Sequence, residues 1–282
     1  MSPFFRKKIK EVFIMEKWMI LLIIPLIISS IGFRNYVWFL SIGYAFSVTG
    51  LVLAIGIMHY SELTILSIIM TAVMCIYSLR LGIFITRREF GNKNYKKVLD
   101  AAANDIAGRK KIPIFVSVSI WIFVTGLYYA QVSPLFYRMT NGLSKKDPVI
   151  FIIGIVIAVL GLLLQTKADS QKDAAKKINP KRFCDTGLYK MVRCPNYFGE
   201  ILVWTGMFVG SITCLQGAGQ ITIAILGYVG IVYFMFNGAR RLEKRQNVSY
   251  GEDPEYQVYV KKVPILIPLV PIYSVENVKF LG

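Results

Sequence analysis

Seven long apolar runs constrain the fold of this chain more than any other feature of its sequence. They span residues 18–33, 36–58, 63–85, 112–131, 149–164, 197–215 and 220–236. A helix needs about 20 apolar residues to cross a hydrocarbon core of about 30 Å, and the two runs of 16 residues reach that length with one flanking turn. The runs lack the alternating polarity of barrel strands. The sequence therefore predicts an all-α, polytopic membrane protein with about seven transmembrane helices.

The composition supports a membrane location and excludes two other classes of protein. Hydrophobic residues make up 55% of the 282 residues and charged residues only 17%, which excludes intrinsic disorder and most soluble folds. The net charge of +17 is explained by the attraction of basic loops to anionic lipid headgroups. No nucleic-acid-binding motif accompanies that charge. We therefore expect the lipid bilayer, and no nucleic acid, as a partner.

The distribution of lysine and arginine predicts the orientation of the chain. Three segments, residues 86–111, 165–196 and 238–282, hold 23 of the 33 basic residues, and with seven spans these segments share one face. The positive-inside rule makes that face cytoplasmic. Five basic residues before residue 18 favour the opposite orientation, but the larger total decides. We therefore expect an integral, multi-pass protein with its N-terminus outside and its C-terminus in the cytoplasm.

The first apolar run is also compatible with a secretory signal peptide. However, no small-residue cleavage site follows Phe33, and the next run is itself apolar. A transmembrane helix is therefore the better interpretation of this run.

The cysteines and the single histidine do not have the spacing of a metal site. The four cysteines form no CxxC motif, and His59 is the only histidine, so we expect neither zinc nor haem. Cys184 and Cys194 fall in a connection predicted to be cytoplasmic, where a disulfide does not normally persist. We expect free thiols.

Two charged residues interrupt the apolar runs, namely Arg80 in the third run and Glu200 in the sixth. Ionisable groups inside a membrane are costly and are usually functional. Tyr77 lies three residues before Arg80, so both side chains project from one face of a helix. The alternatives are that the charged groups snorkel to the interface or form an ion pair, and that Tyr77 is a core residue bonded to a backbone carbonyl.

A second group of polar residues follows the fifth run. Helical spacing places Gln165, Asp169, Lys172 and Lys176 on one side of a helix that extends this run. Lysine suits phosphate groups, and Gln and Asp suit hydroxyl or amide groups. The alternative is a solvated, charged helix face.

The segment from Gly187 to Glu200 has the most specific pattern. Pro195 suits the first turn of a helix, and Asn196 and Glu200 are then one turn apart. A helix start next to Arg193 suits a phosphate or a polarised amide. In the tail, Arg240 and Arg241 precede a segment in which Tyr256 and Tyr259 are three residues apart, where the alternative is an amphipathic surface helix.

These strings together resemble the C-terminal domain shared by steroid 5α-reductases and related bacterial membrane reductases. The resemblance rests on residues 168–172, 185–189, 193–200 and 259–268. It covers about residues 74–271, which divides the chain into N-terminal transmembrane helices (1–73), a steroid 5α-reductase-like domain (74–271) and a C-terminal tail (272–282).

The resemblance implies a seven-helix bundle whose cytoplasmic loops close over NADPH. It also implies reduction of a carbon–carbon double bond conjugated to a carbonyl in a lipophilic substrate. Tyr77 with Arg80 looks like the family's Tyr-x-x-Arg, whose tyrosine polarises the carbonyl, and Asn196 with Glu200 matches the pair beside the nicotinamide. We expect Tyr77 and Glu200 to be catalytic, and the cofactor-binding residues to be Arg80, Gln165, Asp169, Lys172, Lys176, Arg193, Asn196, Arg240, Arg241 and Tyr259. A phenol bonded to the carbonyl oxygen would stabilise the charge that develops when hydride reaches the β-carbon.

Two positions depart from the family pattern. Steroid-reducing members place a glutamate on an early helix opposite the tyrosine, whereas the first two runs here contain no carboxylate, which disfavours a steroid substrate. Cys194 stands where bacterial relatives have histidine.

Two other functions remain open at this point. The Arg-x-Pro-x-Tyr-x-Gly string and the tail are also similar to isoprenylcysteine carboxyl methyltransferases, which use S-adenosylmethionine. Asn196, Glu200 and residues 168–172 favour the reductase. A non-catalytic lipid-binding or scaffold protein is the third hypothesis, and the oligomeric state stays open.

Overall fold

The computed structural model describes residues 17–91, 112–141 and 147–281. Within these residues the chain is helical and has no strand. The chain forms two compact units, one made of Met1–Phe151 with Ser211–Gly227 and the other of Ile152–Gly210 with Tyr228–Gly282. We call them unit 1 and unit 2. The predicted all-α fold is confirmed.

Six helices among the described residues are long and apolar enough to cross a membrane. A shorter apolar helix, Lys17–Phe33, corresponds to the first predicted run. The six are Tyr36–Met58 (η2 and α2), α3 (Ile65–Gly91), α5 (Ile114–Thr140), α6 (Pro148–Ile178), α7 (Pro195–Ser211, continued to Cys214 by η5) and α8 (Gly217–Tyr250). The polytopic membrane architecture predicted from the apolar runs is therefore confirmed.

Four of the predicted runs end before their helices do. α6 continues from Leu164 to Ile178, and α8 continues from Phe236 to Tyr250. These extensions contain Ala, Lys, Gln and Arg, which favour helix without being apolar. An apolar window marks the part of a helix that suits hydrocarbon, so it does not find the helix end.

α5 also continues beyond its apolar run, and this extension contains a charged residue. α5 continues to Thr140 and contains Arg138, whose side chain is buried. Arg138 forms an ion pair with Asp147 at 3.2 Å, and its guanidinium lies 3.7 Å from the centre of the Phe151 ring. Asp147 also accepts a hydrogen bond from Thr213. This cluster ties three segments of unit 1 together.

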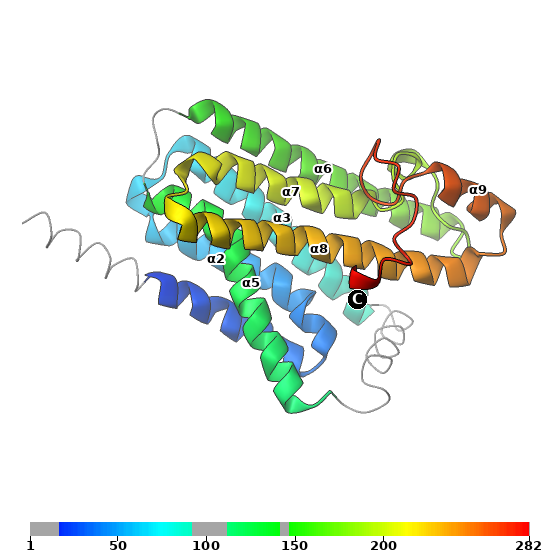
Figure 1. Ribbon diagram of the computed structural model, residues 1–282, viewed down its shortest axis with the longest axis horizontal. Helices are drawn as coiled ribbons and strands as arrows, with labels where there is room; N and C mark the ends of the chain where they lie inside the picture. The colour runs from blue at the N-terminus through cyan, green and yellow to red at the C-terminus, as the bar shows by residue number, and fades with distance from the viewer. Residues whose placement is uncertain (1–16, 92–111, 142–146, 282) are drawn as a thin grey trace, which may run out of the picture. The chain divides into compact units, whose positions relative to one another are not determined.

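In unit 2, α6, α7 and α8 run side by side, and the short helix α9 (Pro254–Lys262) follows the end of α8 (Figure 1). The hydroxyls of Thr205 on α7 and Tyr228 on α8 are 2.8 Å apart. α9 begins at Pro254 after the N-cap Asp253 and ends before Pro264, as the prolines predict. A short helix with Tyr256 buried and its other residues exposed or half-buried is therefore present in the tail.

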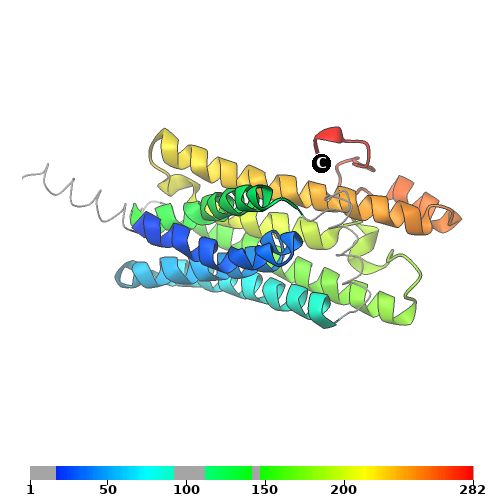
Figure 2. The ribbon, with the colours of Figure 1, turned by 90° about the horizontal axis from the view of Figure 1, so that it is seen from below.

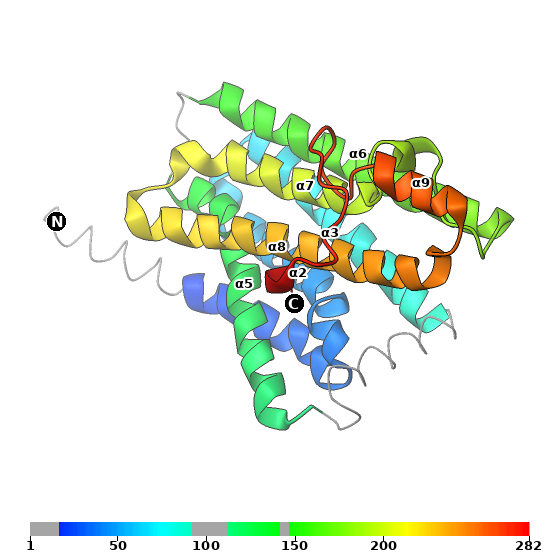
Figure 3. The same ribbon diagram turned by 45° about the vertical axis from the view of Figure 1, so that its right-hand side comes forward.

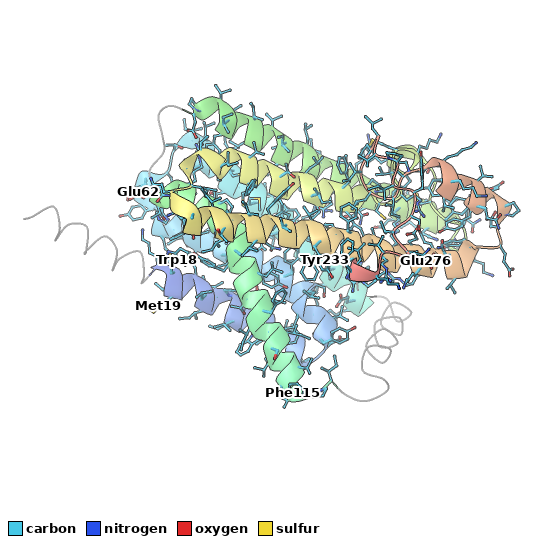
Figure 4. The ribbon with its side chains drawn as sticks, in the orientation of Figure 1. Trp18, Met19, Glu62, Phe115, Tyr233 and Glu276 are labelled. Carbon is cyan, nitrogen blue, oxygen red and sulfur yellow. The ribbon has the colours of Figure 1, made fainter. Side chains whose placement is uncertain are left out.

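The C-terminal segment, residues 263–281, runs back from α9 to α8 (Figure 3). Tyr233 on α8 donates to the carbonyl of Phe280 at 3.0 Å, and Asn237 donates to that of Leu281. Figure 2 shows the end of the segment beside α8. Figure 4 labels Tyr233 together with Glu276, whose carbonyl accepts from Arg240 at 2.9 Å. The segment is thus part of the folded unit.

Two predictions are not decided by this architecture, namely the orientation of the chain and the domain boundary. For the orientation, the basic residues before Lys17 and most of the connection 86–111 lie outside the described residues. The predicted domain boundary at residue 74 reflects a sequence resemblance, whereas the two units reflect compactness. That boundary stays a prediction.

Candidate functional site

The candidate site in unit 2 depends on close packing between α6 and α7. A Cβ atom on Gly161 would lie 2.6 Å from the carbonyl oxygen of Gly199, and one on Gly199 would lie 2.7 Å from the backbone nitrogen of Gln165. Side chains at these positions would separate the helices. The glycines therefore allow polar groups of the two helices to meet.

Gln165 on α6 and Glu200 on α7 form the buried centre of this site. The Gln165 amide donates to a carboxylate oxygen of Glu200 at 3.2 Å, and the residues are 2% and 4% exposed. The amide oxygen of Gln165 finds no hydrogen-bond donor among the described residues. A buried acceptor without a donor is unfavourable, so this oxygen is a candidate acceptor for an N–H group of a ligand. Asn196, half-buried, lies one turn before Glu200.

Asp169 and Lys172 continue along α6 from Gln165. Asp169 is buried and Lys172 is half-buried.

Burial raises the pKa of the Cys194 thiol to about 12, and the charges of Lys172 and Arg193 oppose part of that rise. The thiol therefore stays protonated near neutral pH and is not a nucleophile. All four cysteines are free, and Cys184, Cys194 and Cys214 are buried.

The loop before α7 is held on α6 by two contacts. The side chain of Gln171 accepts a hydrogen bond from the backbone N–H of Leu188 at 2.9 Å, and Tyr189 donates to the carbonyl of Ala168 at 3.3 Å. Gly187 has a φ of +59°, and a Cβ there would lie 2.6 Å from the Gln171 side chain. Only glycine fits this position easily, so Gly187 allows the loop to pass close to Gln171 on α6.

Tyr259 fastens α9 to the same loop. Its hydroxyl donates to the carbonyl of Tyr189 at 2.8 Å, and its ring lies 5.3 Å from that of Phe183. Burial raises the pKa of both tyrosines, so both phenols remain donors. The geometry gives Tyr259 a scaffold contact, and its predicted contact with the cofactor stays a prediction.

Arg193 is engaged in a buried ion pair. It lies 2.7 Å from Glu243 on α8, and the two side chains are 1% and 3% exposed. Arg193 also donates to the carbonyl of Tyr273, and Glu243 accepts from the backbone N–H of Val275 at 2.9 Å. The backbone N–H of Arg193 donates to the carbonyl of Pro264 at 2.9 Å. The pair therefore holds the C-terminal segment against the start of α7.

Lys176 is also occupied by contacts within the protein. Its ammonium donates to the carbonyls of Pro180 and Arg182 at 3.1 and 2.6 Å and to the hydroxyl of Tyr250 at 2.8 Å. An ammonium has three donors, and these bonds use all of them. The contacts tie the end of α6 to the loop that follows it and to Tyr250 on α8. Cofactor binding by Lys176 therefore stays a prediction. Arg241 is exposed on α8.

Tyr77 and Arg80 lie on α3, in unit 1. Tyr77 is fully buried, and its hydroxyl is 2.8 Å from that of Tyr44 on α2. Arg80 is half-buried one turn further along. Of the predicted site residues, the structure brings together Gln165 with Glu200 and joins Arg193 to the tail, whereas Tyr77 and Arg80 belong to the other unit.

Three residues that shape these sites were missed in the sequence, namely Tyr44, Gln171 and Glu243. Tyr44 lies in an apolar run with no charged neighbour, so no local pattern singles it out. Gln171 was seen only as part of a matching string. Glu243 is an acid within a basic stretch, and this isolation is a usable signal for a buried ion pair.

Comparison with known proteins agrees with a reductase-like family. A steroid 5-alpha-reductase DET2 of Gossypium hirsutum is 39% identical over 66 residues, which cover 21% of this chain and 24% of that protein. An uncharacterised protein of Schizosaccharomyces pombe is 24% identical over 221 residues, covering 71% of this chain and 62% of that protein. The matches thus span less than two thirds of either relative. No solved structure matches the chain.

The comparisons give no support to a relation with isoprenylcysteine methyltransferases. The family model described as "Protein of unknown function (DUF1295)" matches residues 15–263, which is most of the chain. The chain therefore belongs to the DUF1295 family, which is steroid 5α-reductase-like.

Proposed function

We propose that this protein is a membrane-embedded, NADPH-dependent reductase of a carbon–carbon double bond conjugated to a carbonyl in a lipophilic substrate. The observation that carries the proposal is the buried Gln165–Glu200 pair with its unsatisfied amide oxygen. The family and the name of the cotton relative support an oxidoreductase. The apolar helices support a substrate that partitions into the bilayer.

The residues of unit 2 fit a nicotinamide cofactor. The carboxamide of nicotinamide has two N–H donors, and the oxygen of Gln165 lacks a donor among the described residues. Lys172 and the exposed Arg241 are cations of the kind that binds phosphate. Asp169 suits a ribose hydroxyl. NADPH would supply the hydride, while the protein supplies orientation and an electrostatic environment.

In this proposal the protein side chains have separate tasks. Asn196, Gln165 and Glu200, all in unit 2, orient the nicotinamide, whereas cofactor binding by Arg80 stays a prediction from the sequence. Tyr77 donates a hydrogen bond to the carbonyl oxygen of the substrate and stabilises the negative charge that develops there. A buried phenol suits this task because water does not compete for the hydrogen bond.

Cofactor titration of the purified protein in lipid nanodiscs tests the proposal. NADPH binding, followed by nicotinamide fluorescence, should be saturable, and Gln165→Leu should weaken it about fivefold, since a lost hydrogen bond costs about 1 kcal/mol. Gln131→Leu is the matched control, because Gln131 is also a buried glutamine with an unsatisfied oxygen but lies in unit 1. Its NADPH affinity should stay at the wild-type value.

Calorimetry with S-adenosylmethionine tests the methyltransferase alternative. Binding of S-adenosylmethionine without binding of NADPH would replace the reductase with the methyltransferase alternative. Binding of neither molecule would favour the non-catalytic hypothesis.

We also propose that the N-terminus lies outside and that the basic end of unit 2 faces the cytoplasm. Cys184 is buried and therefore a poor probe, whereas Ser249 near the end of α8 is exposed. A Ser249→Cys variant in sealed cells should react with an impermeant maleimide only after permeabilisation. Labelling of intact cells would reverse the orientation.

A further inference from the structure

The hydroxyl groups of Tyr44 and Tyr77 form a buried pair that the sequence did not suggest. Their oxygens are 2.8 Å apart, and the residues are 6% and 0% exposed. Tyr44 lies on α2 and Tyr77 on α3, both in unit 1. Neither of the first two apolar runs contains a carboxylate, so a phenol is the acidic group that α2 brings to Tyr77.

The interface between α2 and α3 holds this pair in register. Five residues after Tyr44, the hydroxyl of Thr49 donates to that of Ser78 at 2.8 Å, and Ser78 directly follows Tyr77. A Cβ on Gly82 would lie 3.0 Å from the Phe46 ring, so this glycine allows a close approach. These polar and steric contacts therefore fix the position of Tyr44 along α2 relative to Tyr77 on α3.

The ring of Tyr44 is also supported from α5. It lies 5.4 Å from the ring of Tyr128, and the Tyr128 hydroxyl donates to the carbonyl of Phe39. The Tyr44 ring contacts Tyr128 on one side, and its hydroxyl is hydrogen-bonded to Tyr77, so the ring has little freedom to rotate. Tyr44 therefore presents its hydroxyl to Tyr77 in one position.

A phenol hydrogen-bonded to another phenol changes what the second one can do. When Tyr44 donates to the oxygen of Tyr77, it stabilises negative charge on that oxygen, and hydrogen bonds in such a chain strengthen one another in a low-dielectric site. Tyr77 then becomes a stronger donor toward a substrate oxygen. Bonds to a charged acceptor are stronger than bonds between neutral groups, so the effect grows as charge develops during the reaction.

We propose that Tyr44 is a positioning residue for Tyr77: it donates to the Tyr77 hydroxyl, holds it in place and increases its ability to polarise a substrate carbonyl. This inference rests on the proposed function, in which Tyr77 bonds to the carbonyl of a lipophilic enone. It assigns no direct substrate contact to Tyr44. The substrate-facing hydrogen bond therefore comes from a phenol pair rather than from one tyrosine.

A double-mutant cycle tests this assignment. Tyr44→Phe, Tyr77→Phe and the double variant are compared in nanodiscs for NADPH affinity and for kcat and KM with an enone that the wild type reduces. Tyr44→Phe should lower kcat about 10- to 100-fold, as expected when a hydrogen bond to a charged group is lost, with the Kd for NADPH unchanged. The double variant should be no slower than Tyr77→Phe alone, because Tyr44 acts through Tyr77.

Tyr128→Phe is the matched control. It removes a buried hydroxyl from the same aromatic cluster, where that hydroxyl bonds to a backbone carbonyl, and it should lower thermal stability without a comparable loss in kcat. If Tyr44→Phe and Tyr128→Phe behaved alike, Tyr44 would have only a structural role and the proposal would be overturned.

The outcomes separate this proposal from the proposed function. An active wild type with an unaffected Tyr44→Phe variant, or a double variant slower than Tyr77→Phe by the full Tyr44→Phe factor, would overturn the role of Tyr44 alone. A wild type that binds no NADPH would overturn the proposed function, and the role of Tyr44 would fall with it.

Discussion

Removing the carboxylate of Glu243 should release the C-terminal segment of unit 2. In Glu243→Ala the Arg193 cation would remain buried, with its side chain 1% exposed, and would lose its counter-charge. Removal of one partner from a buried ion pair costs about 3–5 kcal/mol. The backbone N–H of Val275 would lose its acceptor in the same step. The protein avoids this cost most easily by detaching the segment and admitting water to Arg193.

Hydrogen exchange measures this release directly. Since about 1.4 kcal/mol corresponds to a factor of ten, amides near Val275 should exchange about a hundredfold to several thousandfold faster in the variant. Mass spectrometry of peptides from residues 271–281, with the protein in lipid nanodiscs, would report the change. Amides in the middle of α6 and α7 should keep their wild-type rates, because their hydrogen bonds are independent of the segment.

Two further variants decide whether the buried charge is the cause. Glu255→Ala breaks the ion pair with Arg182 in the same unit, where the side chains are 66% and 41% exposed, so it should leave exchange of the segment unchanged. Replacing both buried partners, Arg193→Met with Glu243→Leu, should restore much of the protection, because no charge is left buried. Equal acceleration in Glu243→Ala and Glu255→Ala would refute the reasoning.

Three other contacts lead to simpler predictions. Gly206→Leu should lower the melting temperature because the new side chain would meet the backbone of α6, whereas Gly219→Leu, with nothing within 4 Å of its Cβ, should not; thermal unfolding in detergent would compare them. Cys194 is fully buried, and burial raises the pKa of its thiol to about 12, so iodoacetamide should leave this thiol unmodified until the protein unfolds, as a mass-spectrometric time course would show. Gln171→Ala removes the acceptor of the Leu188 N–H and should cost about 1 kcal/mol, seen as faster exchange of that amide with α6 unchanged.

The membrane helices could be predicted because their apolar length is a direct physical requirement of the bilayer. The run from Tyr36 to Met58 coincides with a helical segment, and Pro195 begins α7 as expected. Helix ends outside the hydrocarbon region follow helix propensity and local capping, which apolar windows do not measure. The continuation of α6 to Ile178 is the clearest example.

The site was predictable only within single elements. Asn196 and Glu200 are one helical turn apart, so their shared side of α7 follows from periodicity. The pairing of Gln165 with Glu200, or of Arg193 with Glu243, joins residues 35 and 50 positions apart. No local pattern specifies such partners, because they depend on which helices pack together and at what height.

The polar residues predicted for the site differ in whether the protein itself satisfies their hydrogen bonds, and this difference bears on which of them bind a ligand. The three donors of Lys176 are satisfied by the protein itself, so its charge is already used in folding. Gln165 keeps an acceptor without a donor among the described residues, directly beside the carboxylate of Glu200. An unsatisfied atom alone is insufficient, because Gln131 has one as well. What distinguishes Gln165 is its hydrogen bond to a buried acid, Glu200, which lies one turn after Asn196 on α7, so the cofactor hypothesis is tested more sharply at Gln165 than at the lysine.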